Sequence, residues 1–437
     1  MFRILLILIC CGGGLFAQTP TLDQLLLEAT NRYPEVRQRQ AELAAARAQL
    51  REAEALRSVR VDALGTYTVA AGGRSIDLPV GDLLNPVYGA LNQLTQSSQF
   101  PSIDNVQEQF LPNNFYDLRL RATYPIYRPE IKIGQSIRRA QVELAETQQA
   151  ITQRDLRRDI RVAYWQIQSA RAAARAYEEA LRLIAEGLRT TRSLIANGLA
   201  LPAARLRLEA ERAQVQAELA RVQAQAANAE AQLNFLLARP LDTPVPLDTL
   251  AARLPDTLRA GTASRSELQQ LRTGLAINEL NQSLEDLFYR PRVGAQLEAG
   301  SQAFNFGFSP YAILGLNVEM PIWDNRMHRH RMDRLTAENQ AQSARLEQVQ
   351  RAVTLEAEVL QNQLTADLQQ VARYEPAVRA ARRAYRDTER LYREGLINYL
   401  NVVDARTSLT QLTIQQTIAA YTAWIRAAEL MRALEIE

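Results

Sequence analysis

The chain has few of the residue types that build disulfide-stapled or metal-bound folds. Of its 437 residues, two are cysteines, the adjacent Cys10 and Cys11, and two are histidines. Two neighbouring cysteines provide no disulfide framework, and so small a supply of Cys and His excludes most zinc ligand sets. Gly (18) and Pro (17) are too scarce for a collagen-like or low-complexity chain. Ala, Gln, Arg, Glu and Leu dominate instead, a composition typical of long helices and coiled coils.

An excess of one charge is also lacking. The 51 basic and 48 acidic residues give a formal charge of +3, and Lys132 is the only lysine. Because the charges are mixed along the chain rather than gathered in one basic stripe, nucleic-acid binding is not indicated. No stretch reaches the ~18 consecutive apolar residues that a transmembrane helix needs.

The N-terminus has the organisation of a secretory signal peptide over residues 1–17. Arg3 precedes a short apolar run, and the small residue Ala17 ends the segment. Cleavage after Ala17 would remove both cysteines. Lipidation at Cys10 or Cys11 is the alternative, although neither follows a small residue. An exported chain without a spanning helix is periplasmic, secreted or an outer-membrane barrel.

The rest of the chain contains two copies of one unit. A Tyr-Pro-Ile-Tyr motif at 124–127 recurs as Met-Pro-Ile-Trp at 320–323, an offset of 196 residues. The Gly-Leu that begins at Gly198 recurs at Gly395, an offset of 197 residues. Such internal similarity indicates a tandem structural repeat.

This repeat predicts the organisation of the chain. The first repeat, 18–239, has a helix, two strands and a long helical hairpin with its tip near residue 198. A proline-rich linker follows over 240–262. The second repeat, 263–437, has the same elements, with its tip near residue 395.

Four segments alternate apolar and polar residues with a period of two, as strands do. Each is close to ten residues long with aromatic residues at its ends, which fits a tilted membrane strand, but a half-buried soluble sheet alternates in the same way. The four segments are 59–69, 116–124, 293–299 and 312–320. An insertion within 71–114, rich in Gly, Pro, Asn, Ser and Gln, separates the first two and reads as a long loop.

The polar sides of these strands are candidate pore-lining positions. They carry Arg60, Asp62, Asp117, Arg119, Arg121, Arg292, Glu298, Asn317 and Glu319. Because membrane barrels start at eight strands, a membrane role for four strands requires an oligomer.

The helices form the larger part of the chain. From Leu156 to Ile195 apolar or small residues recur at spacings of four and three, a 3.5-residue period that predicts a left-handed supercoil. We expect helix from about 133 to 196 and again from 326 to 394. The expected fold is therefore mainly α, with long coiled-coil hairpins and a small β part.

The order and spacing of these motifs resemble the TolC-like outer-membrane efflux proteins. The matching segments are 22–29, 33–35, 124–127, 197–199, 320–325 and 392–405. The resemblance implies a homotrimer in the cell outer membrane, with a 12-stranded barrel against outer-membrane lipid and a 12-helix tunnel extending into the periplasm. It also implies a periplasmic adaptor and an inner-membrane pump as partners, and no cofactor or metal.

The resemblance further implies two functional regions. The helical turns would be the adaptor-docking tips, with Asn197, Gly198, Leu199, Glu394, Gly395 and Leu396. In the family, two acidic residues three positions apart ring the periplasmic gate. Here these positions are Asn401 and Asp404, so one carboxylate is kept and one is an amide. The tyrosine of the family's gate matches Tyr392, while the position of its charged partner is Ile397.

The leading hypothesis is a passive exit duct of a tripartite efflux or type I secretion system, for small molecules or proteins. The alternative is a non-membrane coiled-coil structural protein of the periplasm or cell surface. No catalytic constellation is present, so an enzyme is not expected. His328 and His330 lie among arginines, which would repel a metal cation.

Overall fold

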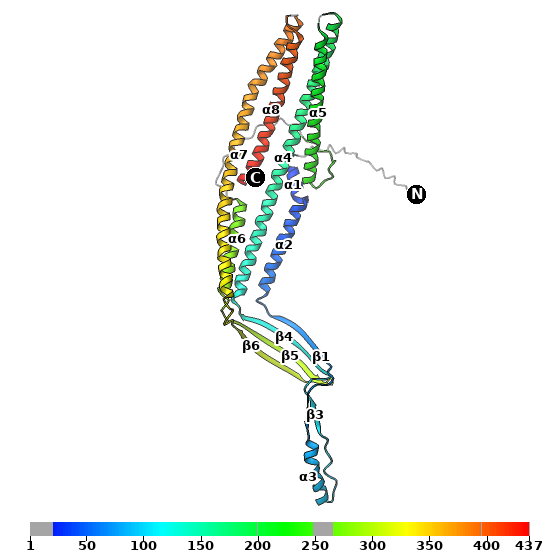
Figure 1. Cartoon of the computed structure of the whole chain (residues 1–437), viewed down its shortest axis with the longest axis vertical. Helices are drawn as coiled ribbons and strands as arrows, with labels where there is room; N and C mark the ends of the chain where they lie inside the picture. The colour runs from blue at the N-terminus through cyan, green and yellow to red at the C-terminus, as the bar shows by residue number, and fades with distance from the viewer. Residues whose placement is uncertain (1–20, 199, 248–264, 395, 437) are drawn as a thin grey trace, which may run out of the picture. The chain divides into compact units, whose positions relative to one another are not determined.

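The computed structural model describes residues 21–198, 200–247, 265–394 and 396–436, and it is mainly helical with a small β part (Figure 1). The chain divides into two compact units. The helical unit consists of Met1–Arg47, Ala140–Ile277 and Glu338–Glu437, and the sheet unit of the residues between them, 48–139 and 278–337. The expected signal peptide, with its cleavage and lipidation sites, lies outside the described residues, as do most of the linker, Leu199 and Gly395.

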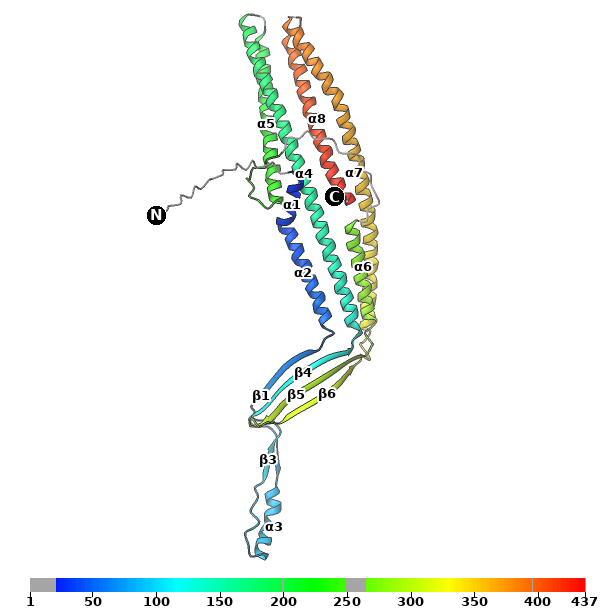
Figure 2. The ribbon, with the colours of Figure 1, turned by 180° about the vertical axis from the view of Figure 1, so that it is seen from behind.

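Seven helices contribute to the helical unit, and four of them also contribute to the sheet unit. They are α1 (Leu22–Arg32), α2 (Pro34–Ala55), α4 (Pro129–Ala196), α5 (Pro202–Leu236), α6 (Ser266–Glu285), α7 (Met327–Arg393) and α8 (Tyr399–Leu434). Figures 1 and 2 show α4 beside α5 and α7 beside α8, so each repeat forms a helical hairpin. The long helices expected over 133–196 and 326–394 are confirmed as α4 and α7.

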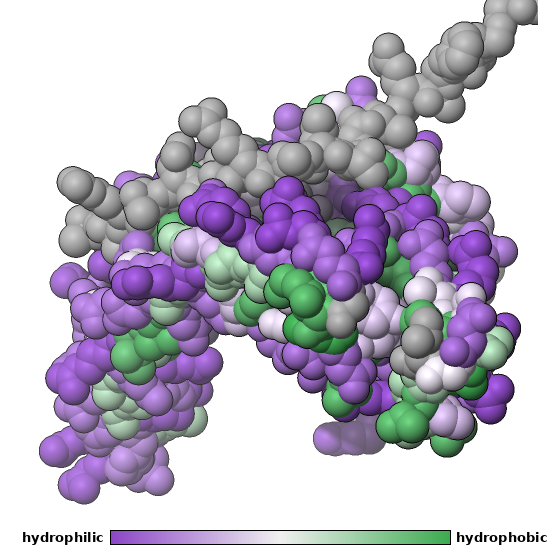
Figure 3. Space-filling view, turned by 90° about the horizontal axis from the view of Figure 1, so that it is seen from above, coloured by the Kyte–Doolittle hydropathy of each residue, from purple (hydrophilic) through white to green (hydrophobic). Residues whose placement is uncertain are grey.

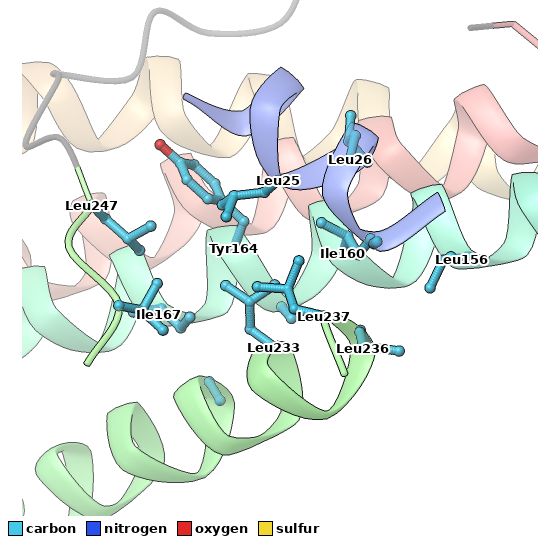
Figure 4. Packing of buried hydrophobic residues seen from close by; sticks show 14 of the residues in the cluster. Leu25, Leu26, Leu156, Ile160, Tyr164, Ile167, Leu233, Leu236, Leu237 and Leu247 are labelled. Atoms are coloured by element: carbon cyan, nitrogen blue, oxygen red, sulfur yellow. The ribbon is translucent and has the colours of Figure 1, made fainter. Parts of the chain in front are cut away.

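The main core of the helical unit forms along α4. Ile160 and Ile167, both predicted seam positions, are fully buried. They pack with Leu25 of α1 and Leu233 of α5, as the close view in Figure 4 shows. The 3.5-residue spacing places such residues on one stripe of α4, and burial of that stripe holds α1 and the end of α5 in place.

A second cluster lies where α4, α5 and α8 meet near the helical turns. Ile184 and Leu188 of α4 pack against Leu208 of α5 and Tyr399 of α8. A Cβ atom at Gly187 would lie 2.0 Å from the Tyr399 hydroxyl oxygen. Only glycine at this position lets the tyrosine ring approach the α4 backbone so closely.

The sheet unit contains the strands of both repeats in one antiparallel sheet. Its order is β1 (Arg60–Thr68), β4 (Phe115–Tyr127), β5 (Arg292–Phe304) and β6 (Pro310–Glu319). Strands β4 and β5, which come from different repeats, pair with each other in the middle of the sheet. The four strands predicted from the alternation are therefore present, and β1 and β6 are the two edges.

The insertion is more ordered than the loop that its composition indicates. It contains β2 (Ser75–Leu78), α3 (Val80–Leu94) and β3 (Val106–Gln109), with β2 and β3 paired. The side-chain amide of Asn85 exchanges two hydrogen bonds with the backbone of Ile103, and Asn92 does the same with Phe100. Asparagines that indicate loops in a sequence here fasten the returning chain to α3, which a composition argument cannot detect.

An ion-pair network joins the start of α6 to the end of α8. Glu267 accepts hydrogen bonds from Arg265 and Arg432, and Arg432 also donates to Asp155 of α4 at 2.6 Å. The arginine side chains are only 7% and 8% exposed. Burial by itself raises the pKa of the Glu267 carboxyl, but the hydrogen bonds from the two arginines outweigh it and lower the pKa from 4.5 to about 2.

The depressed pKa predicts an acid-sensitive contribution to stability. Since Glu267 is harder to protonate when folded, its contribution is complete above pH ~4.5 and is lost as the pH falls toward about 2. Glu267→Gln should lower the free energy of unfolding at neutral pH by on the order of 2–3 kcal/mol and flatten its acid dependence. Urea unfolding followed by circular dichroism at several pH values measures both effects. Glu347→Gln, which breaks the exposed pair with Arg351, is the control, and equal losses in the two variants would contradict the prediction.

Candidate functional site

The strand register places all nine candidate pore-lining residues on one face of the sheet. Asp62 lies opposite Arg121 in β4, Arg121 lies opposite Glu298 in β5, and Glu298 lies opposite Ile313 in β6. The remaining candidates follow by alternation from these pairs. They are Arg60, Asp117, Arg119, Arg292, Asn317 and Glu319.

Opposite charges neutralise one another across this polar face. Glu298, whose side chain is 9% exposed, accepts a hydrogen bond from Arg121 and lies 3.9 Å from Arg119. Arg119 donates to Asp117 at 2.6 Å, and the Tyr311 hydroxyl donates to the same carboxylate at 3.0 Å. The face is therefore strongly polar but carries compensated charge.

The opposite face of the sheet is apolar and exposed. Leu118 of β4 is 59% exposed, and Leu314, Leu316 and Val318 of the edge strand β6 are 76%, 70% and 69% exposed. Isolated apolar side chains are normal on protein surfaces, but contiguous patches mark sites that contact another protein or a membrane. This sheet face is such a patch.

Aromatic side chains lie at both ends of the sheet. At one end Phe115 contacts Phe304 with ring centroids 5.1 Å apart, and Tyr67 stacks on Phe306 at 5.4 Å. Beyond the other end of β6, Trp323 is 72% exposed. Aromatic residues at both margins of an apolar band are typical of proteins that contact both interfaces of a bilayer.

The two helical turns differ in how they end their first helix. Gly198 has a φ of +70°, the left-handed conformation that commonly terminates a helix. The Asn197 amide donates to the Ser193 carbonyl at 2.8 Å. In the second turn, Glu394 and Leu396 donate backbone hydrogen bonds to the last turn of α7, and Leu396 is 66% exposed.

The candidate gate residue Asp404 has a partner that the sequence reasoning missed. Arg207 of α5 donates to it at 2.5 Å, and the two side chains are 50% and 59% exposed. The signal was in the repeat itself, because the two positions are 197 residues apart, the offset between Gly198 and Gly395. Equivalent positions of the two repeats thus meet between α5 and α8.

The other two gate candidates have different surroundings. Asn401 is exposed in the first turn of α8, while Tyr392 packs against Tyr399 with ring centroids 4.9 Å apart. The Tyr392 hydroxyl is buried without a hydrogen-bond partner within the described residues. Burial, together with the neighbouring Tyr399, raises the pKa of the Tyr392 phenol.

A buried ion pair anchors α8 to α5 just below the gate position. Arg406, whose side chain is 3% exposed, donates to Glu211 at 2.7 Å, and the Thr407 hydroxyl donates to the same carboxylate at 2.8 Å. Removing one partner of such a pair would leave an uncompensated buried charge, so this contact fixes how α5 and α8 pack.

Metal-binding and membrane-spanning helical features were sought over the described part of the chain. It holds no group of three or more His, Cys, Asp or Glu side chains that could bind a metal ion. Among those same residues, none of the helices combines the length and apolar character needed to cross a membrane.

Comparison with known proteins identifies the class to which this architecture belongs. Residues 260–434 match the sequence model of the outer membrane efflux protein family. No curated protein matches the chain. The structure is similar to the outer-membrane channel OprN, with a TM-score of 0.78 and 20% identity over 96% of this chain and 90% of that chain.

Two further solved structures show the same likeness. The outer membrane protein VceC from Vibrio cholerae matches with a TM-score of 0.76 and 19% identity, over 95% of this chain and 97% of that chain. The MtrE outer membrane channel of Neisseria gonorrhoeae, in its open state, matches with a TM-score of 0.75 and 16% identity, over 95% and 89% of the two chains.

At such low identities the structural likeness shows the fold, while the sequence match shows the relationship. Proteins of the matching family are passive channels rather than enzymes. Residues 260–434 therefore belong to the outer membrane efflux protein family, and the chain has the fold of the TolC-like channels.

Proposed function

We propose that three copies of this chain form a passive exit duct in the cell outer membrane. The strands of the trimer would make a 12-stranded barrel, and the helices a 12-helix tunnel in the periplasm. An inner-membrane pump and a periplasmic adaptor would deliver the cargo, small molecules or proteins, as in tripartite efflux or type I secretion. The matches to outer membrane efflux channels support this role.

The observation that carries the proposal is the contrast between the two faces of the sheet. One face has compensated charges, which suit a wet lumen, and the other exposes leucine and valine side chains. In water this apolar face would be unfavourable, whereas against lipid it is at its most stable.

The open edges of the sheet supply the second argument. Strands β1 and β6 end the strand order, so one side of each lacks a paired strand within the described residues. A bilayer cannot satisfy unpaired backbone groups, so a sheet edge must be closed there. Pairing β6 of one copy with β1 of the next closes the sheet, and three copies of four strands give an even, edge-free barrel.

The rival interpretation is a coiled-coil structural protein of the periplasm or surface, with the strands as soluble hairpins. It would leave the apolar face and both aromatic margins without a role. The two interpretations differ in which sheet face tolerates charge.

Neighbouring residues of β6 provide a matched test. Leu314 lies on the apolar face and Ile313 on the polar face, both near the middle of the strand. An arginine facing mid-bilayer lipid costs about 2–4 kcal/mol, while the lumen tolerates it. Leu314→Arg should therefore reduce the heat-resistant trimer in outer-membrane fractions severalfold, and Ile313→Arg should leave it unchanged. Equal tolerance of both substitutions would favour the soluble coiled-coil protein.

We place the periplasmic gate at Asp404, with Asn401 and Tyr392 beside it. Three copies of Asp404 near the trimer axis would form a carboxylate ring, which attracts cations. The contact with Arg207 reduces the net charge of that ring, because each carboxylate faces a cation of its own chain. The unpartnered Tyr392 hydroxyl would find a donor or acceptor in a neighbouring copy.

Conductance of the purified trimer in planar bilayers tests this gate. A trivalent cation added on the periplasmic side should block weakly, and Arg207→Gln should strengthen the block about tenfold by freeing the carboxylates. Adding Asp404→Asn to that variant should remove the block. Arg205→Gln, which breaks a neighbouring exposed pair with Glu209, is the control. If Arg207→Gln behaves like this control, the charge that governs block lies elsewhere.

The ordered insertion is placed to cover the extracellular mouth. Figures 1 and 2 show α3 and the β2–β3 pair extending from the sheet beyond the turn between β1 and β4. Long loops of outer-membrane barrels lie on the extracellular side, so we assign the insertion to that side. Its amide hydrogen bonds give it the rigidity of a lid.

Deleting residues 74–112 tests the lid. The backbone N–H of Phe110 donates to the Arg74 carbonyl at 3.0 Å, so the ends of the deleted segment are close and the strands can be rejoined. Trimers should still assemble, and their single-channel conductance should rise because the mouth is uncovered. Trimers that assemble with unchanged conductance would show that the insertion does not cover the mouth.

A further inference from the structure

Positive charge is concentrated around the helical turns. Residues 182–212 and 379–406, which flank the two turns, carry thirteen arginines and seven carboxylates, a net charge of +6. The whole chain has a net charge of +3, so the remainder is slightly acidic. We call the exposed residues of these two segments the tip surface.

Many cations of the tip surface have no carboxylate to neutralise them. Arg406 is buried, and the other twelve arginines are exposed. Seven of these pair with a carboxylate, for example Arg393 with Glu389 at 2.6 Å and Arg207 with Asp404. Five have no ion-pair partner in the described residues: Arg189, Arg192, Arg212, Arg382 and Arg386.

The spacing of these cations suits a helical partner. Arg189 and Arg192 are three residues apart on α4, and Arg382 and Arg386 are four apart on α7, so each pair lies on one side of its helix. A facing helix with carboxylates at the same spacing would match them.

Apolar side chains complete the tip surface. Leu201 and Leu206 are 73% and 58% exposed around the first turn, and Leu396 is 66% exposed in the second. Figure 3 views the molecule from the end at which the turns lie in Figure 1, and it shows separate apolar patches within a hydrophilic surface. Apolar anchors ringed by charge are characteristic of protein-binding surfaces.

We propose that the tip surface docks an acidic α-helical hairpin of a periplasmic partner. Its carboxylates would pair with the five free arginines, and its apolar residues would contact the three leucines. The inference rests on the proposed function, because it specifies the chemistry of the adaptor. An anionic lipid surface fits less well, since carboxylates such as Glu209 and Glu394 lie among the arginines and would repel a uniformly negative plane.

Two synthetic helical hairpins test the charge preference. They have the same apolar positions, with glutamate at the exposed positions of one and lysine in the other. Immobilised wild-type trimer should bind the acidic hairpin at least about tenfold more tightly at about 50 mM salt, and the difference should shrink at about 500 mM. Equal binding of the two hairpins would overturn the inference.

Variants with equal charge changes locate the effect. Replacing all five free arginines by glutamine should abolish the preference for the acidic hairpin. The control variant replaces five exposed arginines outside the tip surface: Arg37, Arg51, Arg329, Arg345 and Arg373. Glutamine keeps the helix propensity in both variants. Equal loss of preference in both would show that net charge, and not the tip surface, is responsible.

Other occupants appear as distinct results. Binding to phosphatidylglycerol vesicles without binding to the acidic hairpin would overturn the inference in favour of a lipid surface. Dissociation of the trimer in the five-glutamine variant would show that these arginines pair between copies, which also overturns it. Conductance of the same wild-type preparation separates the two levels: a conducting trimer without charge preference refutes this inference alone, and a protein that forms no conducting trimer refutes the proposed function.

Discussion

The helical unit depends on one buried stripe of α4. Ile160 and Ile167 on this stripe hold α1 and the end of α5, and Ile184, closer to the turn, packs against Tyr399 of α8. Because a single helix supplies both clusters, its 3.5-residue spacing sets the heights at which the other helices attach. Alanines such as Ala163 on the same stripe let the neighbouring backbones approach closely.

Periodic features of the structure could be predicted from the sequence, because periodicity reports which side of an element is buried. Alternation in Tyr116–Tyr124 gave the strand and the face of Arg121, and the register of β4 with β5 then brought Arg121 to Glu298. The spacing of Leu156, Ile160 and Ala163 gave the seam of α4. The repeat boundaries, the trimer and the docking role of the turns remain predictions.

Contacts between distant side chains could not be predicted in this way. Glu267 and Arg432 are far apart in the chain, and only the packing of α6 against α8 brings them together. The helix α3 was missed because Asn85 and Asn92 indicate a loop unless their backbone partners are known. A common property emerges from these polar contacts, since buried carboxylates such as Glu298 and Glu211 face arginines. Uncompensated charge is thereby left to the exposed surface around the turns.

The pairing of Arg207 with Asp404 bears on how the duplicated gene diverged. These are equivalent positions of the two repeats, and they touch each other. In an assembly of identical, unduplicated repeats that kept this contact, the same side chain would occupy both positions, and an ionised residue would face its own like charge. Only after duplication could the two copies acquire opposite charges there. An attractive contact at this height is thus a product of gene fusion, available to a two-repeat chain and closed to its single-repeat ancestor.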